Sequence, residues 1–202
     1  MGALLPLFPL DVVLLPGTPM PLHIFEPRYK EMISECLAGK TAFGIVRAKE
    51  DGIAEIGCSA EILEVTKRYD DGRMDLVCEG RRRFEVIGLN EERAFLQAEV
   101  SYFDDEPGRA PTEQGKEAVR LYLDLIRLLD SDAEAPEADM PQLSFQLAAP
   151  MPLDLDFKQA LLGMRSEKER LAALVTYYQA LLPRMRRAVK ARQKAGGNGH
   201  AM

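Results

Sequence analysis

Two different spacings of apolar residues follow one another along this chain, and the change between them divides it. Up to residue 104, apolar and polar residues alternate in short stretches, which is typical of strands that bury one face. From residue 116 on, apolar residues recur every three or four positions, which is typical of amphipathic helices. We therefore predict a β-rich subdomain over 1–104, a polar linker over 105–115 and a helical bundle over 116–193. Residues 194–202, which include GGNG, are expected to be a disordered tail.

The first apolar stretch, residues 4–29, is interrupted by prolines. Because each proline fixes φ and lacks a backbone N–H, we expect short extended pieces joined by rigid corners rather than a central strand. Pro27 is suited to the first turn of a helix, where a missing N–H has no consequence. Residues 28–38 then carry apolar side chains at helical spacing, and Gly39 is placed to end this helix.

Segments typical of strands follow this helix. Residues 58–69 alternate apolar and polar side chains, and Asp70-Asp71-Gly72 has the composition of a hairpin turn, since Gly adopts a positive φ at little cost. We expect this turn to lead into a return strand at 73–78. Further strands are expected at 41–48, 83–89 and 95–103. Several short strands separated by turns indicate a small β-barrel or a folded sheet.

Helical segments are expected after the linker. They cover residues 117–129, 139–149, 154–163 and 166–193. Ser166 and Glu169 have the spacing of a capping box at the start of the last segment. Pro183 lies inside that segment and is expected to kink or split the helix, because it cannot donate a hydrogen bond to the carbonyl of Gln179.

Composition and charge narrow the classes of function. The chain has 202 residues and is 47% hydrophobic, which is ordinary for a soluble globular protein. Its net charge of −6 argues against a general affinity for nucleic acid. No apolar run approaches the roughly 20 residues of a membrane span, and the N-terminal stretch lacks the positive segment of a signal peptide, so we predict a cytoplasmic location. The 3 cysteines have no CxxC spacing, and reduced thiols are expected.

Short motifs in the first half resemble catalytic or nucleotide-binding patterns, but each lacks an essential part. The GKT sequence at 39–41 matches the end of a phosphate-binding loop, but Ser34 stands where a Gly is required, and a helix precedes it where a strand is required. The segment 57–61 is similar to a nucleophile elbow, but Glu61 replaces its second Gly. His23 has no companion ligands and is expected to be structural. We therefore expect no catalytic residue, no cofactor and no metal site.

Two basic groups leave an alternative function open. The first consists of Arg81, Arg82 and Arg83, and the second is the run of Arg and Lys between residues 184 and 194. The first is typical of a solvated strand edge, and the second of a solvated helix end whose cations complement the helix dipole. The alternative is that either group contacts RNA or another anion.

The N-terminal stretch carries a resemblance to a known family. Its matching features are Phe8-Pro9, Pro16-Gly17, Leu22, Ile24-Phe25-Glu26 and Arg28-Tyr29. In the second half they are Leu143, Ala148, Pro152-Leu153, Lys158-Gln159, Leu161-Leu162 and Arg170-Leu171. Together they resemble the N-terminal substrate-recognition domain of the Lon family of ATP-dependent proteases over about residues 4–182. The resemblance implies an α+β fold, with a PUA-like β-barrel that contains one helix, followed by a C-terminal helical bundle.

The resemblance also implies a function. In Lon the ATPase and Ser–Lys peptidase modules would follow, and this sequence does not contain them, so we expect a module that binds unfolded or client polypeptides without catalysis. It would act as an adaptor for an ATP-dependent protease or chaperone and form a weak homodimer, because Lon domains self-associate. We expect the peptide to contact apolar side chains near the domain junction and in a Pro-rich loop. These candidates are Met20, Leu22, Tyr102, Phe103 and Met151. The alternative is that they are core or scattered surface residues.

Overall fold

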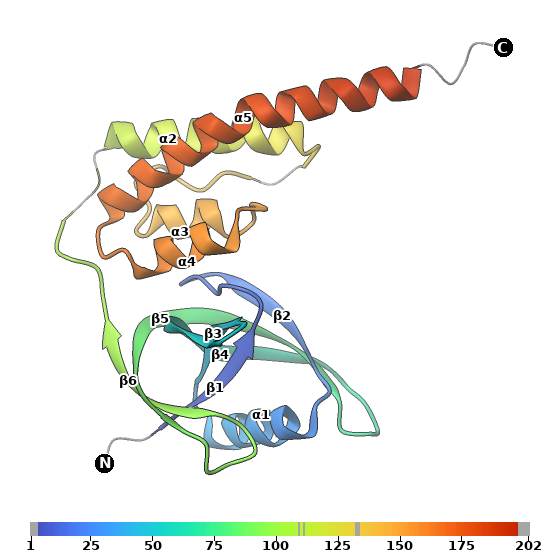
Figure 1. The fold of residues 1–202 in the computed structure, drawn as a ribbon, viewed down its shortest axis with the longest axis vertical. Coiled ribbons are helices and arrows are strands. Elements are labelled where there is room, and N and C mark those ends of the chain that lie inside the picture. Colours follow the sequence, from blue (N-terminus) through green and yellow to red (C-terminus); the bar gives the residue numbers. More distant parts are fainter. Residues whose placement is uncertain (1–3, 109, 111, 132–133, 198–202) are drawn as a thin grey trace. The chain divides into compact units, whose positions relative to one another are not determined.

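The computed structural model describes residues 4–108, 110, 112–131 and 134–197. The first half contains the strands and one helix, and the remaining helices follow (Figure 1). The strands are β1 (Leu5–Leu10), β2 (Pro19–Ile24), β3 (Phe43–Lys49), β4 (Gly52–Arg68), β5 (Met74–Asn90) and β6 (Gln97–Phe103). The helices are α1 (Pro27–Gly39), α2 (Thr112–Leu128), α3 (Leu143–Ala148), α4 (Leu155–Gly163) and α5 (Glu167–Gly197). The predicted α+β class is confirmed.

The strands form one mixed sheet that closes on itself. Their order is β2-β5-β4-β3-β1-β6, and β6 also pairs with β5, so that five strands make a ring and β2 lies outside it. β1 and β3 are parallel, and the other pairs are antiparallel. β5 can serve both β2 and β6 because it is 17 residues long: its first half pairs with β2 and its second half with β6.

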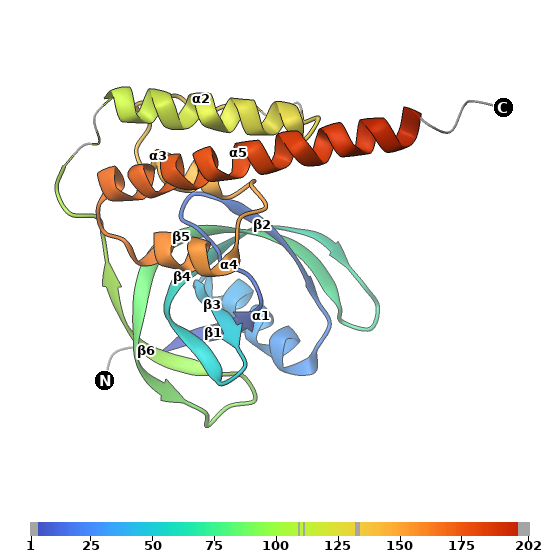
Figure 2. The ribbon, with the colours of Figure 1, turned by 45° about the horizontal axis from the view of Figure 1, so that its top comes forward.

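The turn at Asp70-Asp71-Gly72 joins β4 to β5 as predicted. Gly72 has a φ of 82°, a region that favours glycine. The hairpin projects from the ring of strands in both views of the ribbon (Figure 2). The predicted hairpin is therefore confirmed.

β1 lies inside the sheet, between β3 and β6, although it contains Pro6 and Pro9. The expectation that the prolines exclude a central strand is therefore wrong for this segment. β1 pairs with β6 at Leu5 and Pro6, and with β3 from Leu7 to Leu10, so only one neighbouring strand is paired at each of these positions. A proline has no backbone N–H, so it fits in a strand only where no neighbouring strand needs that donor. The staggered pairing of β1 leaves one side of the strand without such a neighbour at each proline.

Helix α1 begins at Pro27 as predicted, but its end differs from the prediction. Gly39 is the last helical residue, and Lys40 adopts the left-handed conformation with a φ of 50°. The backbone N–H of Lys40 donates to the carbonyl of Cys36, which satisfies one carbonyl of the last turn. The buried face of α1 consists of Tyr29, Met32, Ile33 and Cys36, all of which the helical spacing predicts.

Two compact units divide the described fold. One consists of Met1–Asp105 with Met151–Arg165, and the other of Glu106–Pro150 with Ser166–Met202. The helical spacing predicts that 151–165 belongs to the helical bundle, whereas helix α4 in this segment packs on the strands. Gln159 in α4 donates to the backbone carbonyl of Ile56 in β4 at 2.9 Å. The helical spacing of α4 therefore predicts its structure but not the unit that it joins.

The second unit contains α2, α3 and α5 around a buried polar group. The Arg170 side chain is fully buried, donates to the hydroxyl of Ser144 at 2.8 Å and pairs with Glu167 at 2.5 Å. α5 continues through Pro183, so the predicted split does not occur. The carbonyl that loses its partner belongs to the exposed Gln179, where water can replace the missing donor. Residues 194–197 are helical, and the rest of the predicted tail lies outside the described residues.

Candidate polypeptide-binding surface

The second half of β5 and the whole of β6 form an antiparallel ribbon with one apolar face. In its register Phe84 lies opposite Tyr102, Val86 opposite Val100, and Leu89 opposite Ala98. Opposed residues of an antiparallel pair point to the same side of the sheet. The side chains of these residues therefore share one face of the ribbon.

This apolar face is only partly covered. Phe84 and Ala98 are fully buried in a core cluster. The remainder of the cluster consists of Leu5, Leu7 and Val46, with Ile53, Val86, Leu96 and Val100 partly buried against it. On this face the exposed fraction is 51% for Leu89 and 39% for Tyr102. Ile87 at the adjoining bulge and Leu4, which precedes β1, are also exposed, by 59% and 38%.

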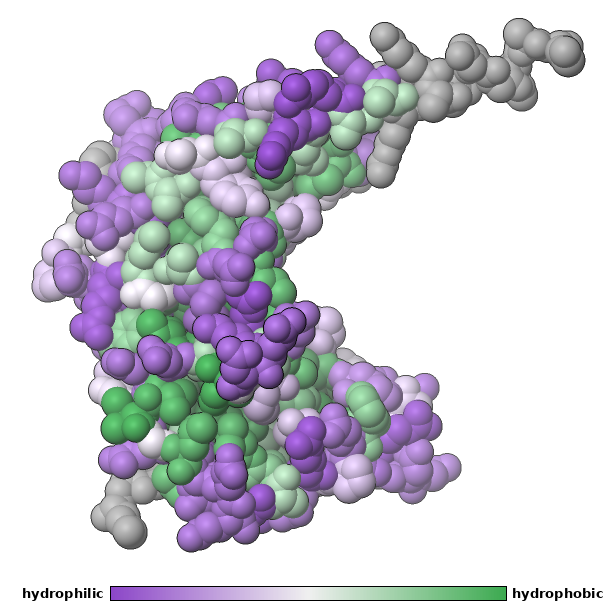
Figure 3. Space-filling view, in the orientation of Figure 1, coloured by the Kyte–Doolittle hydropathy of each residue, from purple (hydrophilic) through white to green (hydrophobic). Residues whose placement is uncertain are grey.

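We call these exposed residues and their half-buried neighbours the apolar arm. It comprises Leu4, Ile53, Val86, Ile87, Leu89, Leu96, Val100 and Tyr102. Figure 3 shows hydrophobic surface over the part of the first unit where Figure 1 places β6 and the start of β1. Large exposed apolar side chains that gather in this way mark interaction surfaces in soluble proteins.

A β-bulge contributes to the exposure of the arm. The register shifts between Val86 and Gly88, so that Ile87 has no opposite residue in β6. A bulge bends its strand and changes the direction of a side chain. A Cβ on Gly88 would meet nothing within 4 Å, so the ribbon is open to solvent here. Alternation in the sequence does not reveal this shift, and for that reason Ile87 and Leu89 are absent from the predicted site residues.

The structure does not bring all the predicted site residues to one accessible surface. Tyr102 lies in the apolar arm. Phe103 is only 8% exposed and Met151 only 1%, so neither offers surface to a peptide in this conformation. Met20 and Leu22 are half-buried on β2, opposite Cys78 and Leu76, and do not belong to the arm.

The arginines at 81–83 are each paired with a carboxylate. Arg81 contacts Glu61 at 2.8 Å, and Arg82 contacts Asp104 at 3.3 Å. The guanidinium of Arg82 also lies 4.8 Å from the ring centroid of Tyr102. These pairs offset the positive charge that an RNA site would need, and they favour the interpretation of a solvated strand edge.

Arg83 is a buried structural residue. Its side chain is 1% exposed and donates to the backbone carbonyls of Leu162 at 3.1 Å and Met164 at 2.5 Å. It also pairs with Asp105 at 2.5 Å and lies over the ring of Phe103 at 4.7 Å. One guanidinium therefore joins the ribbon to the end of α4 and to the segment after β6.

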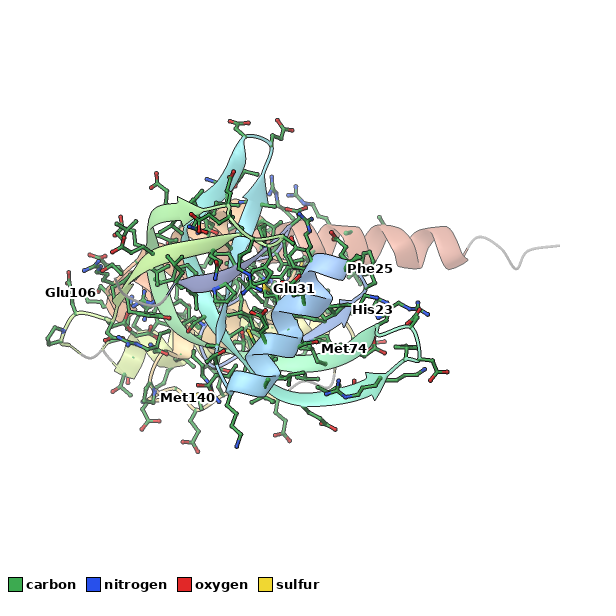
Figure 4. All side chains as sticks on the ribbon, turned by 90° about the horizontal axis from the view of Figure 1, so that it is seen from below. His23, Phe25, Glu31, Met74, Glu106 and Met140 are labelled. Carbon is green, nitrogen blue, oxygen red and sulfur yellow. The ribbon has the colours of Figure 1, made fainter. Side chains whose placement is uncertain are left out.

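His23 belongs to a surface hydrogen-bond network. Its Nδ1 lies 2.5 Å from a carboxylate oxygen of Asp75, whose other oxygen accepts from the Tyr69 hydroxyl at 2.8 Å. The hydrogen bonds from His23 and then from Tyr69 hold the pKa of Asp75 below its usual value. The imidazole stacks on Phe25, with ring centroids 5.8 Å apart (Figure 4). These contacts are those of a structural residue on the surface.

The other candidate motifs do not assemble a reactive site. The Ser59 hydroxyl lies inside β4, where it donates to the backbone carbonyl of Arg82 at 3.2 Å and accepts from its N–H at 3.0 Å. The GKT motif joins the end of α1 to β3, so its amides do not open a helix that could hold phosphate. Within the described residues there is no group of three or more His, Cys, Asp or Glu placed to hold a metal ion. None of the described helices is long and apolar enough to cross a membrane.

Curated relatives place the chain beside the N-terminal parts of larger proteins. It is 28% identical over 145 residues to a Lon protease of Parabacteroides distasonis, covering 67% of this chain and 18% of that protein. It is 26% identical over 204 residues to a Lon protease of Flavobacterium johnsoniae, covering 90% of this chain and 24% of that protein. The chain therefore spans less than a quarter of the length of these relatives.

Solved structures show the same fold. A Lon N-terminal domain protein from Xanthomonas campestris superposes with a TM-score of 0.72 at 28% identity, covering 87% of this chain and 98% of that one. The N-terminal domain of a Mycobacterium avium complex Lon protease superposes with a TM-score of 0.63, covering 88% and 98%, and its 21% identity supports the fold alone. The sequence model of one protein family, the ATP-dependent protease La (LON) substrate-binding domain, matches residues 4–179. The chain therefore belongs to the LON substrate-binding domain family.

Proposed function

We propose that this protein is a non-catalytic module that binds unfolded polypeptides through the apolar arm. The observation that carries the proposal is the exposure of Ile87, Leu89 and Tyr102 on one paired ribbon. The family is described as a substrate-binding domain, and its relatives include Lon proteases, whose substrates are polypeptides. Apolar segments of an unfolded chain are chemically matched to such a surface.

The size of the arm sets the affinity that we expect. Its most exposed side chains offer on the order of 300–400 Å² of apolar surface, equivalent to roughly 8–10 kcal/mol before the cost of association. Association and the ordering of a flexible peptide cost at least about 4 kcal/mol. We therefore expect dissociation constants in the micromolar range or weaker, which is compatible with a module that must release its clients.

A binding experiment with a matched control tests the proposal. A fluorescent, reduced and carboxymethylated protein serves as the unfolded client, and its anisotropy is titrated with the purified module. The variant with Ile87→Ser and Leu89→Ser is expected to bind roughly 10-fold more weakly, since this corresponds to only about 1.4 kcal/mol. Leu63→Ser is the control, because Leu63 is 53% exposed and also lies at a bulge, in β4. Equal losses in both variants, or no saturable binding of the wild type, would contradict the proposal.

We further propose that the module acts as an adaptor for an ATP-dependent protease or chaperone. Its affinity would let it hold a client briefly and then transfer it. Addition of the module to a Lon-type protease that degrades the labelled client is expected to raise the rate of degradation. A module that only sequesters the client would lower this rate, and that result would refute the adaptor role.

RNA binding remains the alternative for the exposed cations of α5. These cations are Arg184, Arg186, Arg187 and Lys190. None of them forms an ion pair with the residues that the structure describes. Salt-dependent RNA binding that is lost when they are replaced by Gln would favour this alternative, and its absence would dismiss it.

A further inference from the structure

The apolar arm lies on a ribbon whose negative charges are not neutralised. Between residues 84 and 102 the exposed carboxylates belong to Glu85, Glu91, Glu92 and Glu99. None of them forms an ion pair with any residue that the structure describes. The ribbon therefore combines exposed apolar surface with unpaired negative charge.

The exposed arginines nearest to these carboxylates in the sequence, Arg82 and Arg93, are already engaged. Arg93 pairs with Glu31 at 2.7 Å and with Glu35 at 2.5 Å, and both of these glutamates lie on α1. The hydrogen bond from Arg93 holds the pKa of Glu35 below its usual value, as expected for a formed ion pair. Arg82 pairs with Asp104. Neither arginine therefore offsets the field of the glutamates on the ribbon.

The glutamates are close enough to act on a segment bound to the arm. Glu99 lies opposite Gly88, between Ala98 and Val100, and so points to the other face of a single ribbon. Glu91 and Glu92 lie in the turn that follows β5, directly after Leu89 and Asn90. Glu85 and Glu99 adjoin the arm residues Val86 and Val100 along their strands, a rise of about 3.3 Å, whereas the screening length in 0.1 M salt is about 10 Å. Their field therefore extends over the apolar face.

We propose that the apolar arm selects polypeptide segments in which apolar residues are flanked by Lys or Arg. This inference rests on the proposed function and names the class of client. An acidic segment would meet like charge without a counterion, which disfavours it, and a basic segment would be attracted and bind faster. Polypeptides with apolar residues between basic flanks are thus the chemical complement of this surface.

Peptides with one apolar core and different flanks test the inference. Three fluorescein-labelled peptides share a Leu-Val-Phe-rich core and carry Lys, Ser or Glu flanks. The Lys peptide is expected to bind at least about 10-fold more tightly than the Glu peptide at low salt, and the ratio is expected to shrink as salt shortens the screening length from about 30 Å to about 3 Å. Binding of the Lys and Ser peptides with equal affinity would overturn this inference and leave the proposed function intact. If none of the peptides bound, the proposed function itself would fail.

Two variants with equal changes in net charge test whether the ribbon glutamates cause the preference for Lys-flanked peptides. In the first, Gln replaces the ribbon glutamates Glu85, Glu91, Glu92 and Glu99. In the control, Gln replaces exposed glutamates elsewhere, namely Glu64, Glu106, Glu134 and Glu137. The first variant is expected to lose the preference for Lys over Ser, and the control is expected to keep it. An equal loss in both would trace the preference to net charge and overturn the proposal.

A second copy of the chain is the competing occupant of the arm, because α5 ends in a basic segment. Sedimentation of the wild type and of the first variant distinguishes the two. The inference requires that no second copy covers the arm when the wild type binds the Lys peptide. If the wild type self-associated and the variant did not, the arm would be an interface between copies, and the proposal would be overturned.

Discussion

Arg83→Met removes a buried guanidinium and keeps an unbranched apolar side chain of similar length. The guanidinium donates to the carbonyls of Leu162 and Met164 and pairs with Asp105. After the substitution these carbonyls and the carboxylate lose a donor that water can replace only in part. We therefore expect the first unit to lose stability, although the methylene part of the side chain is preserved.

The size of the expected loss of stability follows from the burial of the ion pair between Arg83 and Asp105. Breaking a buried ion pair by removing one partner costs about 3–5 kcal/mol. The carboxylate of Asp105 is 21% exposed, so it recovers part of its hydration, and we expect a loss of about 3 kcal/mol. Arg82→Met serves as the control, because Arg82 is 54% exposed, contacts Asp104 at 3.3 Å, and should contribute at most about 1 kcal/mol.

Urea unfolding followed by circular dichroism measures both losses. Adding Asp105→Ala to Arg83→Met removes the carboxylate that loses this guanidinium and is expected to restore part of the stability. A loss in Arg83→Met no larger than in Arg82→Met would refute the reasoning. The same conclusion would follow if Asp105→Ala made the Arg83→Met variant still less stable.

Three further perturbations test other parts of the first unit. Gly80→Ala would place a Cβ 2.2 Å from the backbone carbonyl oxygen of Leu15, and thermal unfolding should show a loss of at least about 1–3 kcal/mol. Asp75→Asn tests the hydrogen bond to His23. Because the pKa of Asp75 is lowered in the fold, its carboxylate stabilises the protein at pH values above the ordinary pKa of about 3.9. This stabilisation is lost as the pH falls through the lowered pKa. The stability difference between wild type and Asp75→Asn, measured by thermal melts, should therefore shrink below about pH 4. Burial raises the pKa of the Cys58 thiol to about 12, so mass spectrometry should find Cys58 unmodified by a disulfide reagent in the native protein and modified in urea.

Local patterns in the sequence predict the elements that depend on local chemistry. Pro27 marks the start of α1, Asp70-Asp71-Gly72 marks the hairpin, and helical spacing gives the buried face of α1. These features depend on residues a few positions apart, whose preferred φ and side-chain directions are intrinsic.

Features that depend on distant parts of the chain could not be predicted in this way. Arg83 is buried because carbonyls 79 and 81 residues later accept its hydrogens, and an arginine triplet gives no indication of them. The bulge at Ile87 depends on the register between β5 and β6, which period-two alternation does not fix once an extra residue is inserted. Of the five candidate residues named from the sequence, only Tyr102 therefore lies in the proposed apolar arm, where the expected strand and the observed apolar face coincide.

The arm offers apolar side chains together with part of a strand edge, and this decides how a client would bind. β5 pairs with β2 and β4 in its first half, but β4 pairs with it only as far as Glu85, so that residues 86–90 pair with β6 alone. The outer strand of the sheet is β2, where Pro19 and Pro21 supply no N–H, so an added strand would lack donors there. An extended client would therefore find main chain to pair with at residues 86–90 rather than at β2. Main-chain pairing, apolar contacts on the arm and charge at the flanks of the client all tolerate many sequences, which suits a module that must accept many clients.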